Sequence, residues 1–406
     1  ADPYFPVFSV DNGFDINDTS RSRFSSVRIH DSYTKDRDLA ARVDAERRLQ
    51  LGDQNLWLQT GLLHREKSRS TGETREVFGA NSSNPFHLDD VSFDEGFGSI
   101  LDGRYEQQTG LDPAKGSAFL LSNPERFSYS SYGSKIESAP QSYDADETVS
   151  SGYLLAVGEK GPWNLQLGGR LEYTETATRG TVVIPLAVND PSEGSLIEEV
   201  TDPSNGSVSV IKDLYSKNDY TNFLPSFEVA YALDEDSELK ASWFQLLMRP
   251  QYFNIVDYRR VSIPTQSISE GNPELEPTLI DKLRVAWTRE FEALGSLSLE
   301  AYLINIENFF YGAVSTEYIQ EDGVPVLYRV SRVENGDSGK IKGFEVQWRK
   351  PIDHLLLLEK GSVEIAYTYS DSEAHVATRP GDVLRVPERS DHLLKASLSG
   401  VAGRFS

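Results

Sequence analysis

The sequence predicts an all-β protein whose antiparallel strands form a transmembrane β-barrel. Three observations support this class. Apolar and polar side chains alternate along many segments, and short and long connections follow one another along the chain. No apolar run approaches the ~20 residues that a membrane-spanning helix needs. The 406 residues could hold several ordinary domains, but one large β architecture fits as well. We therefore expect one barrel region over residues 1–406.

Composition excludes several functions. The formal net charge is −23, whereas nucleic-acid binding needs a basic surface, so we expect no nucleic-acid partner. The chain has no cysteine and therefore no disulfide framework or thiolate metal site. Its six histidines lack the spacing of metal ligands. We expect no cofactor, no metal and no catalytic residue, and an enzyme is the least favoured class.

The alternation is clearest from Trp163 to Tyr173, where Trp, Leu and Tyr occupy odd positions and Asn, Gln, Arg and Glu occupy even ones. A β-strand sends successive side chains to opposite faces, so one face is apolar and the other polar. A second sheet covers the apolar face in a soluble sandwich, whereas lipid covers it in a barrel with a wet lumen. The segments exceed the usual five or six residues of globular strands, and a tilted membrane strand needs ~9–11. Length therefore favours the barrel.

The connections differ in length in a regular way. Tight turns are expected near 159–162, 234–237 and 293–296, and a slightly longer one near 353–361. Long polar connections lie near 67–141, 178–217, 250–277 and 371–387. This order is typical of barrels with short periplasmic turns and long extracellular loops. About twelve strands follow, with ends uncertain by ~2–4 residues: 22–32, 38–51, 55–67, 142–157, 162–177, 217–233, 237–249, 277–291, 296–318, 326–350, 361–371 and 388–399.

Several motifs follow one another in a recognisable order. Arg249-Pro250 ends one segment, and Gly271-Asn272-Pro273-Glu274-Leu275-Glu276-Pro277 leads into the next, because proline is tolerated at strand starts. An aromatic segment, Tyr302 to Phe310, comes next, followed by a Gly-x-x-x-Gly-x-Glu element that ends at Glu345. In this order, the motifs resemble the β-barrel region of TonB-dependent outer-membrane receptors.

The resemblance implies a bacterial outer-membrane receptor and transporter. Members of that family take up a scarce nutrient, such as a carbohydrate or a siderophore, and the TonB complex drives uptake through a plug domain. The implied partners are TonB, a small-molecule ligand and outer-membrane lipid. Family barrels have about twenty-two strands. The chain is therefore expected to be a fragment that lacks the plug and the C-terminal strands, with unpaired end strands on a curled, open sheet. A passive porin or translocator barrel and a soluble all-β surface binding module are the alternatives.

The loop from Arg249 to Glu270 is the expected ligand-binding region. Its aromatic rings and hydrogen-bond donors suit a polar ligand. The candidate residues are Arg249, Tyr252, Asn254, Tyr258, Arg259 and Arg260. The alternative is that they only pack the loop against its neighbours. The oxygen-rich run from Asp11 to Asp18 could bind calcium, although it lacks the EF-hand spacing, and a solvated loop is the other interpretation.

Overall fold

The structure is a computed structural model that describes residues 18–402 except 53, 82, 94–97, 101–104, 108–109, 191, 356–357 and 387–388. The chain divides into two compact units. Unit 1 contains residues 1–33, 72–141 and 200–208, and unit 2 contains residues 34–71, 142–199 and 209–406. We describe each unit by itself.

Strands dominate the described chain. They are β1 (Ser26–Leu51), β2 (Gln54–Ala80), β3 (Gly98–Ile100), β4 (Tyr105–Gln107), β5 (Phe127–Ser130), β6 (Tyr143–Lys160), β7 (Trp163–Pro185), β8 (Val188–Asn189), β9 (Ser195–Thr201), β10 (Val208–Ala232), β11 (Ser237–Met248), β12 (Arg259–Ser262), β13 (Ser267–Glu270), β14 (Thr278–Phe291), β15 (Gly295–Glu307), β16 (Phe310–Glu321), β17 (Val324–Asn335), β18 (Ser338–Leu355), β19 (Leu358–His375) and β20 (His392–Ala402). The α-helices are α1 (Pro113–Ser122), α2 (Ser131–Ser138) and α3 (Tyr252–Ile255), and short 3-10 turns lie at Thr19–Arg21, Leu88–Asp90, Pro124–Arg126 and Ala139–Gln141.

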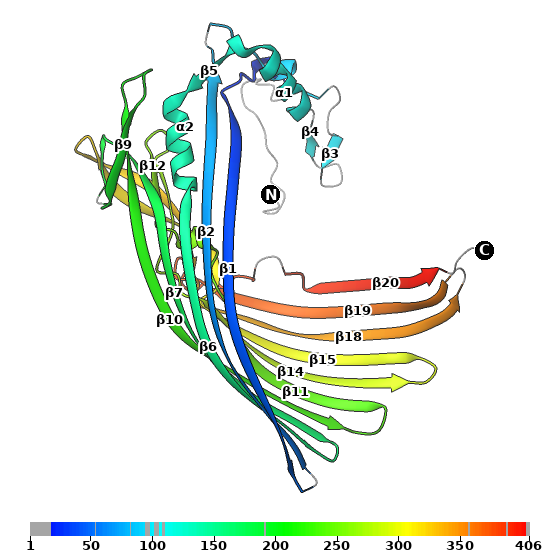
Figure 1. Cartoon of the computed structure of the whole chain (residues 1–406). Coiled ribbons are helices and arrows are strands. Elements are labelled where there is room, and N and C mark those ends of the chain that lie inside the picture. The colour runs from blue at the N-terminus through cyan, green and yellow to red at the C-terminus, as the bar shows by residue number, and fades with distance from the viewer. Residues whose placement is uncertain are drawn as a thin grey trace. The chain divides into compact units, whose positions relative to one another are not determined.

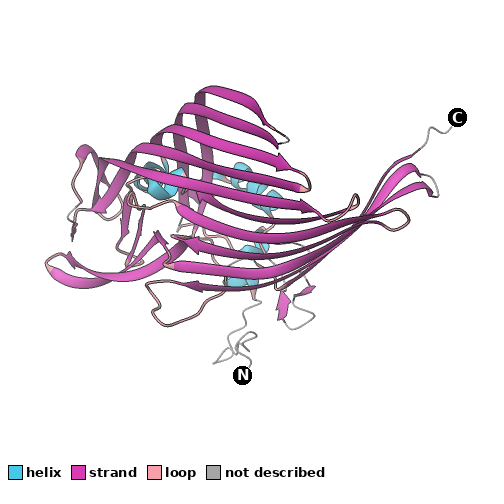
Figure 2. Cartoon of the chain, turned by 90° about the horizontal axis from the view of Figure 1, so that it is seen from below, coloured by secondary structure: helices cyan, strands magenta, loops and turns pink. Residues whose placement is uncertain are grey.

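Unit 2 is built on an antiparallel sheet in which neighbours in space follow chain order (Figure 1). The order is β2, β6, β7, β10, β11, β14, β15, β18, β19 and β20. These strands lie side by side over most of their length (Figure 2). Strand β1 pairs with β2, and among the described residues no pairing joins β1 to β20. The structure thus confirms the antiparallel all-β class and is consistent with an open sheet.

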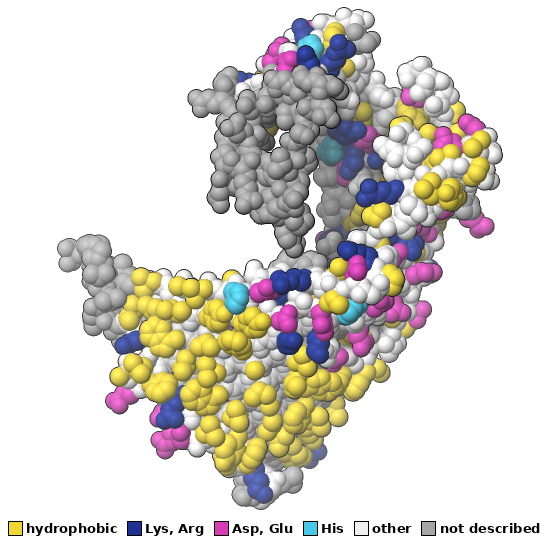
Figure 3. Space-filling model, turned by 180° about the vertical axis from the view of Figure 1, so that it is seen from behind, with side chains coloured by type: hydrophobic (Ala, Val, Ile, Leu, Met, Phe, Trp, Pro, Cys, Tyr) yellow, Lys and Arg dark blue, Asp and Glu magenta, His cyan; other side chains and the backbone are white. Residues whose placement is uncertain are grey.

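One face of this sheet is apolar and uncovered. The register places Leu167, Phe227, Trp243 and Leu283 in one row across four neighbouring strands. Leu167 is 63% exposed and Leu283 is 46% exposed. Figure 3 shows hydrophobic side chains gathered over a broad face of the molecule. Because the row is open rather than buried under a second sheet, the sandwich arrangement does not apply to it.

The opposite face of the same strands is polar. The next row places Gln166, Glu228, Ser242 and Arg284 side by side. Arg284 lies 3.7 Å from carboxylate oxygens of both Glu228 and Glu300. Ion pairs of this kind keep charged side chains stable on a partly enclosed wall. The two faces therefore have the chemistry of a barrel with lipid outside and water inside.

Several predicted boundaries were wrong. The predicted strands 22–32 and 38–51 are one strand, β1, which begins only at Ser26, because the polar residues between them continue the extended backbone. The predicted strand 296–318 is two strands, β15 and β16, separated at Asn308, whose φ of 56° is left-handed. Likewise, 326–350 is two strands, β17 and β18. The predicted long connection at 67–141 contains part of β2 and the helices α1 and α2, and the one at 178–217 contains the end of β7, β8, β9 and the start of β10.

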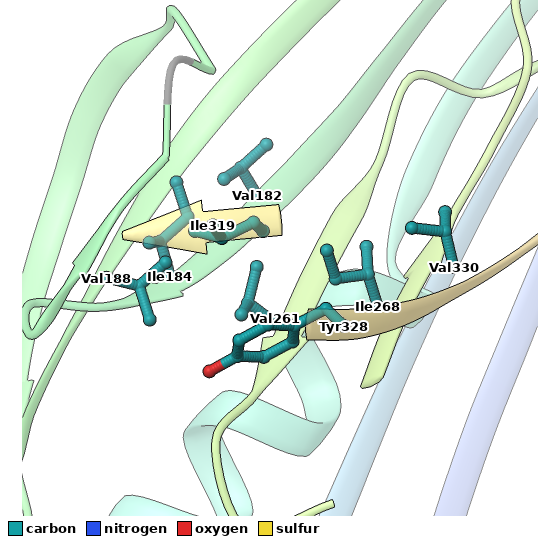
Figure 4. Packing of buried hydrophobic residues seen from close by; sticks show 8 residues of the cluster. All are labelled: Val182, Ile184, Val188, Val261, Ile268, Ile319, Tyr328 and Val330. Carbon is teal, nitrogen blue, oxygen red and sulfur yellow. The ribbon is translucent and has the colours of Figure 1, made fainter. Parts of the chain in front are cut away.

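Three connections of unit 2 join in a second, smaller set of pairings, which we call the loop sheet. Strand β12 pairs with β13 and, in parallel, with the end of β7. Strand β13 pairs in parallel with β17, β17 pairs with β16, and β16 pairs with β8. The loop sheet encloses a core shown in Figure 4, formed by Val182, Ile184, Val188, Val261, Ile268, Ile319, Tyr328 and Val330. This core fixes the three connections to one another.

Unit 1 has its own small aromatic core. The Phe24 ring stacks on Phe86, with centroids 4.5 Å apart, and Phe127 lies edge-on to both. Arg28 donates hydrogen bonds of 2.6 and 2.9 Å to Glu137 of α2. Among the described residues, none of the helices has the length and apolar character that crossing a membrane requires.

Candidate ligand-binding site

Arg249 is the first residue after β11, and its guanidinium lies on the polar face of unit 2. It bonds to Glu172 of β7, whose side chain is only 6% exposed, and donates to Thr174 Oγ1 at 3.2 Å. Arg170 donates to the same carboxylate at 2.6 and 2.9 Å. Glu172 therefore lies between two guanidinium groups, and this arrangement fixes the start of the loop against β7.

Three buried polar atoms near Glu172 lack a hydrogen-bond partner. They are the only such side-chain atoms among the residues that the structure describes: Ser151 Oγ, Asn222 Oδ1 and Arg249 Nε. Ser151 and Asn222 are both register partners of Glu172, one on each neighbouring strand. Buried polar atoms are normally satisfied by protein, water or ligand. This part of the wall therefore has unused hydrogen-bonding capacity.

Tyr252 is the second predicted residue on this wall. Its hydroxyl donates to Glu147 Oε1 at 3.3 Å, and Glu147 Oε2 lies 3.6 Å from Arg249 Nε. Burial, and then the Glu147 charge, raise the pKa of Tyr252, so it keeps its proton at neutral pH. Lys67 Nζ lies 5.1 Å from the ring centroid, and Arg69 Cζ lies 5.3 Å from it. Tyr252 thus presents its ring to two cations.

Those cations belong to a basic series on β2. Arg65, Lys67 and Arg69 are two residues apart and point to the same face. Arg69 donates two hydrogen bonds of 2.7 Å to Asp36, and Arg65 Nε donates to Asp38 at 2.9 Å. Both acids lie on β1, which pairs with β2. We call Arg249, Tyr252, Glu147, Glu172 and these three cations the Arg249 cluster.

Arg259 lies in a different environment within the loop sheet. Its Nε donates to Asp190 at 2.8 Å, its Nη2 donates to Glu317 at 3.1 Å, and its Nη1 bonds to Glu270. Arg332 also approaches Glu270, at 3.4 Å. The Arg259 side chain is 14% exposed. We call these residues the Arg259 cluster.

The pKa values of two carboxyl groups of this region, Asp190 and Asp257, shift in opposite directions. Burial acts to raise the pKa of Asp190, but hydrogen bonds from Ser192 and Arg259 outweigh it and leave that pKa below its ordinary value. Among the described residues, no such donor reaches Asp257, so burial, with help from the Glu270 charge, raises its pKa. Asp190 is therefore stabilised as an anion, whereas ionised Asp257 is disfavoured.

The remaining predicted residues pack the loop. Tyr258 is buried, and its ring stacks on Phe253 with centroids 4.7 Å apart. The Asn254 carbonyl accepts a hydrogen bond of 2.7 Å from the Asn272 backbone. Arg260 lies opposite Ser269 in the β12–β13 register and is partly buried. The structure thus gives Arg249 and Tyr252 a place on the polar wall and the other residues a place inside the folded loop.

Close approach explains two glycines of this region. A Cβ atom at Gly271 would lie 1.8 Å from the Val256 carbonyl oxygen, and one at Gly180 would lie 2.2 Å from the Asp257 carbonyl oxygen. No side chain fits at those distances. Gly271 belongs to the Gly-Asn-Pro motif, so the glycine of this motif is needed where the loop folds back on itself.

Sequence reasoning missed the basic series on β2 and its acidic partners. The signal was present, because three cations at every second position of a strand must share one face. A second missed group lies in unit 1, where a 3-10 turn brings ligand atoms of His87, Asp89 and Asp90 within 4.8 Å of one another. In the candidate calcium run, Asp18 pairs with Arg21 at 2.9 Å, and Asp11 to Asn17 lie outside the described residues.

Comparison with known proteins gives a consistent picture. The family model described as "TonB dependent receptor-like, beta-barrel" matches residues 2–402. A similar solved structure is the ferric citrate transporter FecA in its unliganded form, with 14% identity and a TM-score of 0.51 over 91% of this chain and 40% of that one.

Two further structures are similar at lower scores. The ferric-catecholate import receptor Fiu from E. coli K12 shows 12% identity and a TM-score of 0.49, covering 89% of this chain and 41% of that one. The siderophore receptor PiuA from Acinetobacter baumannii shows 14% identity and a TM-score of 0.47, covering 87% and 41%. The chain thus spans about two fifths of the length of these structures. No curated protein matches it by sequence.

Proposed function

Because the chain belongs to the TonB dependent receptor-like β-barrel family, we propose that it serves the uptake of a scarce nutrient across the bacterial outer membrane. In this proposal the TonB complex drives transport, and a carbohydrate, a siderophore or a similar small molecule is the ligand. The barrel itself carries out no covalent chemistry. Its role is to hold the ligand and to form the wall along which the ligand moves.

The opposed faces of the sheet are the main support. An uncovered row of Leu167, Phe227, Trp243 and Leu283 suits hydrocarbon, because lipid accepts apolar side chains without cost. The ladder between strands satisfies the backbone groups, for which lipid offers no partner. A soluble module would leave this row in water.

We propose that the ligand contacts the loop that follows β11. Arg249 and Tyr252 are the foremost contacts, since they lie on the polar wall beside polar atoms that lack a partner. Asn254, Tyr258, Arg259 and Arg260 complete the region by giving the loop its shape. A rigid loop favours binding, because less conformational freedom is lost when the ligand arrives.

A pair of substitutions tests the membrane orientation. Leu167→Arg places a charge on the apolar row, and Gln166→Arg places the same charge on the polar face next to it. In the intact protein, Leu167→Arg is expected to lower the stability of the membrane-inserted barrel by ~2–4 kcal/mol and its amount in the outer-membrane fraction. Gln166→Arg is expected to leave both near the wild-type level. Equal effects of the two variants, or a wild-type chain that stays in solution without detergent, would contradict the proposal.

Uptake is measured separately. A strain whose intact gene carries Arg249→Ala is expected to grow more slowly than wild type on the limiting nutrient, while the amount of protein in the outer membrane is unchanged. Growth equal to wild type on every nutrient that the wild-type protein supports would remove Arg249 from the ligand site.

A further inference from the structure

Lys67 carries a positive charge that the Arg249 cluster does not neutralise. Each arginine of the cluster has a carboxylate partner, namely Asp36 for Arg69, Asp38 for Arg65 and Glu172 for Arg249. Among the described residues, no carboxylate oxygen lies within the 4.0 Å of an ion pair from Lys67 Nζ. The Lys67 side chain is partly exposed, so solutes can reach it.

The acid directly across the sheet from Lys67 is directed elsewhere. Glu147 is the register partner of Lys67 on β6. Its Oε1 accepts from the Tyr252 hydroxyl, and its Oε2 lies beside Arg249. Two contacts therefore hold Glu147 away from the ammonium group. The Tyr252 ring takes the place of a counter-ion, which leaves the lysine donors available.

The geometry points to an oxyanion subsite at Lys67, and we propose that it binds a carboxylate or phosphate group of the transported solute. The ammonium group supplies the ionic contact, and Arg69, over the same ring, adds a positive field. This inference rests on the proposed uptake function and adds the chemistry of one group of the solute.

Local charge also supports an anion. The cationic side chains of the wall are five, and the acids that they face are four: Arg65, Lys67, Arg69, Arg170 and Arg249, with Asp36, Asp38, Glu147 and Glu172. This local excess of one positive charge contrasts with the net charge of −23 of the whole chain. The negative charge of most of the protein repels an anionic solute, whereas this local positive charge attracts it.

Calorimetric titration of the purified full chain in nonionic detergent tests the subsite. Inorganic phosphate and malonate are the two probes, and glucose is the neutral one. Saturable binding of phosphate, malonate or both is expected, and the stronger probe tells which oxyanion the subsite prefers. Lys67→Gln is expected to weaken this binding about tenfold, or about 1.4 kcal/mol, because it removes the charge from the hydrogen bond to the anion. Lys67→Arg is expected to retain it within about threefold, since a guanidinium also binds oxyanions.

Lys240→Gln is the matched control. It removes one positive charge from the same polar face, but Lys240 already faces Glu228 at 3.3 Å, so anion binding is expected to stay at the wild-type level. The inference fails if wild type shows no saturable binding of either anion up to tens of millimolar. It also fails if Lys240→Gln weakens binding as much as Lys67→Gln does. Neither result affects the Leu167 and Gln166 comparison, so the two proposals can fail independently.

Discussion

The two arginine clusters of unit 2 contain the same types of residue but differ in how completely their cations are paired with carboxylates. In the Arg259 cluster, a nearly buried guanidinium contacts three carboxylates inside the loop sheet. In the Arg249 cluster, the cations lie along a polar wall, and Lys67 lacks an acidic partner within ion-pair distance among the described residues. A saturated cluster contributes to fold stability, whereas an unsaturated one on an accessible wall can bind a solute. The balance of charges therefore distinguishes the structural Arg259 cluster from the proposed binding site.

Substitution of the central arginine of the Arg259 cluster should show the largest difference between the two clusters. Arg259→Met leaves Asp190, Glu270 and Glu317 facing one another without their shared partner. Loss of one member of a buried pair costs about 3–5 kcal/mol. We expect the opening free energy of β12 and β13, measured by amide hydrogen exchange, to fall by about 3 kcal/mol. Lys67→Met should leave it unchanged. Equal protection in wild type and Arg259→Met would show that the cluster is not structural.

A glycine substitution tests how closely the loop packs. Gly271→Ala puts a methyl group 1.8 Å from the Val256 carbonyl oxygen, so the backbone must shift. Overpacking of this kind costs about 1–3 kcal/mol. Thermal unfolding should show the loss. Gly312→Ala in β16 is the control, because a Cβ atom there has no neighbour within 4 Å, and it should keep the wild-type midpoint. A wild-type midpoint for Gly271→Ala would contradict this packing.

Two substitutions of Tyr252 distinguish the contribution of its ring from that of its hydroxyl group. Tyr252→Phe removes the hydrogen bond to Glu147 and keeps the ring under Lys67. We expect the loop to lose about 1 kcal/mol of stability, measured by hydrogen exchange at α3. Anion binding should be largely retained, because Arg249 still holds Glu147 away from Lys67. Tyr252→Leu removes both features and should weaken anion binding, and the inferred role of the ring is wrong if Leu and Phe behave alike.

The smallest effect concerns pH. The pKa of Asp257 is raised in the folded protein, so its ionisation at neutral pH opposes folding. Asp257→Asn should therefore raise stability at neutral pH, and this gain should disappear as the pH falls below 3.8, the ordinary value. Asp190 has a lowered pKa and contributes stability above 3.8 that is lost as the pH falls through its folded value. Asp190→Asn should then destabilise at neutral pH, and denaturant unfolding at several pH values measures both signs.

Local patterns were enough to predict the main sheet. Period-two alternation around Trp163 to Tyr173 identified a real strand, and the turns at 161–162, 233–236 and 292–294 join β6 to β7, β10 to β11 and β14 to β15 as expected. These features depend on neighbouring residues alone. The division of 296–318 could not be seen, because an apolar segment continues on both sides of Asn308 and only its backbone geometry ends the strand.

Only part of the candidate site could be predicted from the sequence. The loop with Arg249 and Tyr252 was identified by composition, but its partners on β2, β6 and β7 are distant in the chain and are brought together by register. The loop sheet depends on parallel pairings such as that of Arg259 with Val182, for which no local pattern exists. Charge pairing across strands is a property of the fold rather than of any one segment.

Strand β7 is longer than a crossing of the membrane requires. Its 23 residues pair with β10 along their whole length, a span of about 75 Å, while about 10 residues suffice for a tilted crossing of the hydrocarbon layer. If the membrane lies at the Trp163 end, where the apolar row is, the paired strands β7 and β10 continue for tens of ångströms past the headgroups. A solute held at the Pro185 end of these strands would then lie clear of the lipid surface.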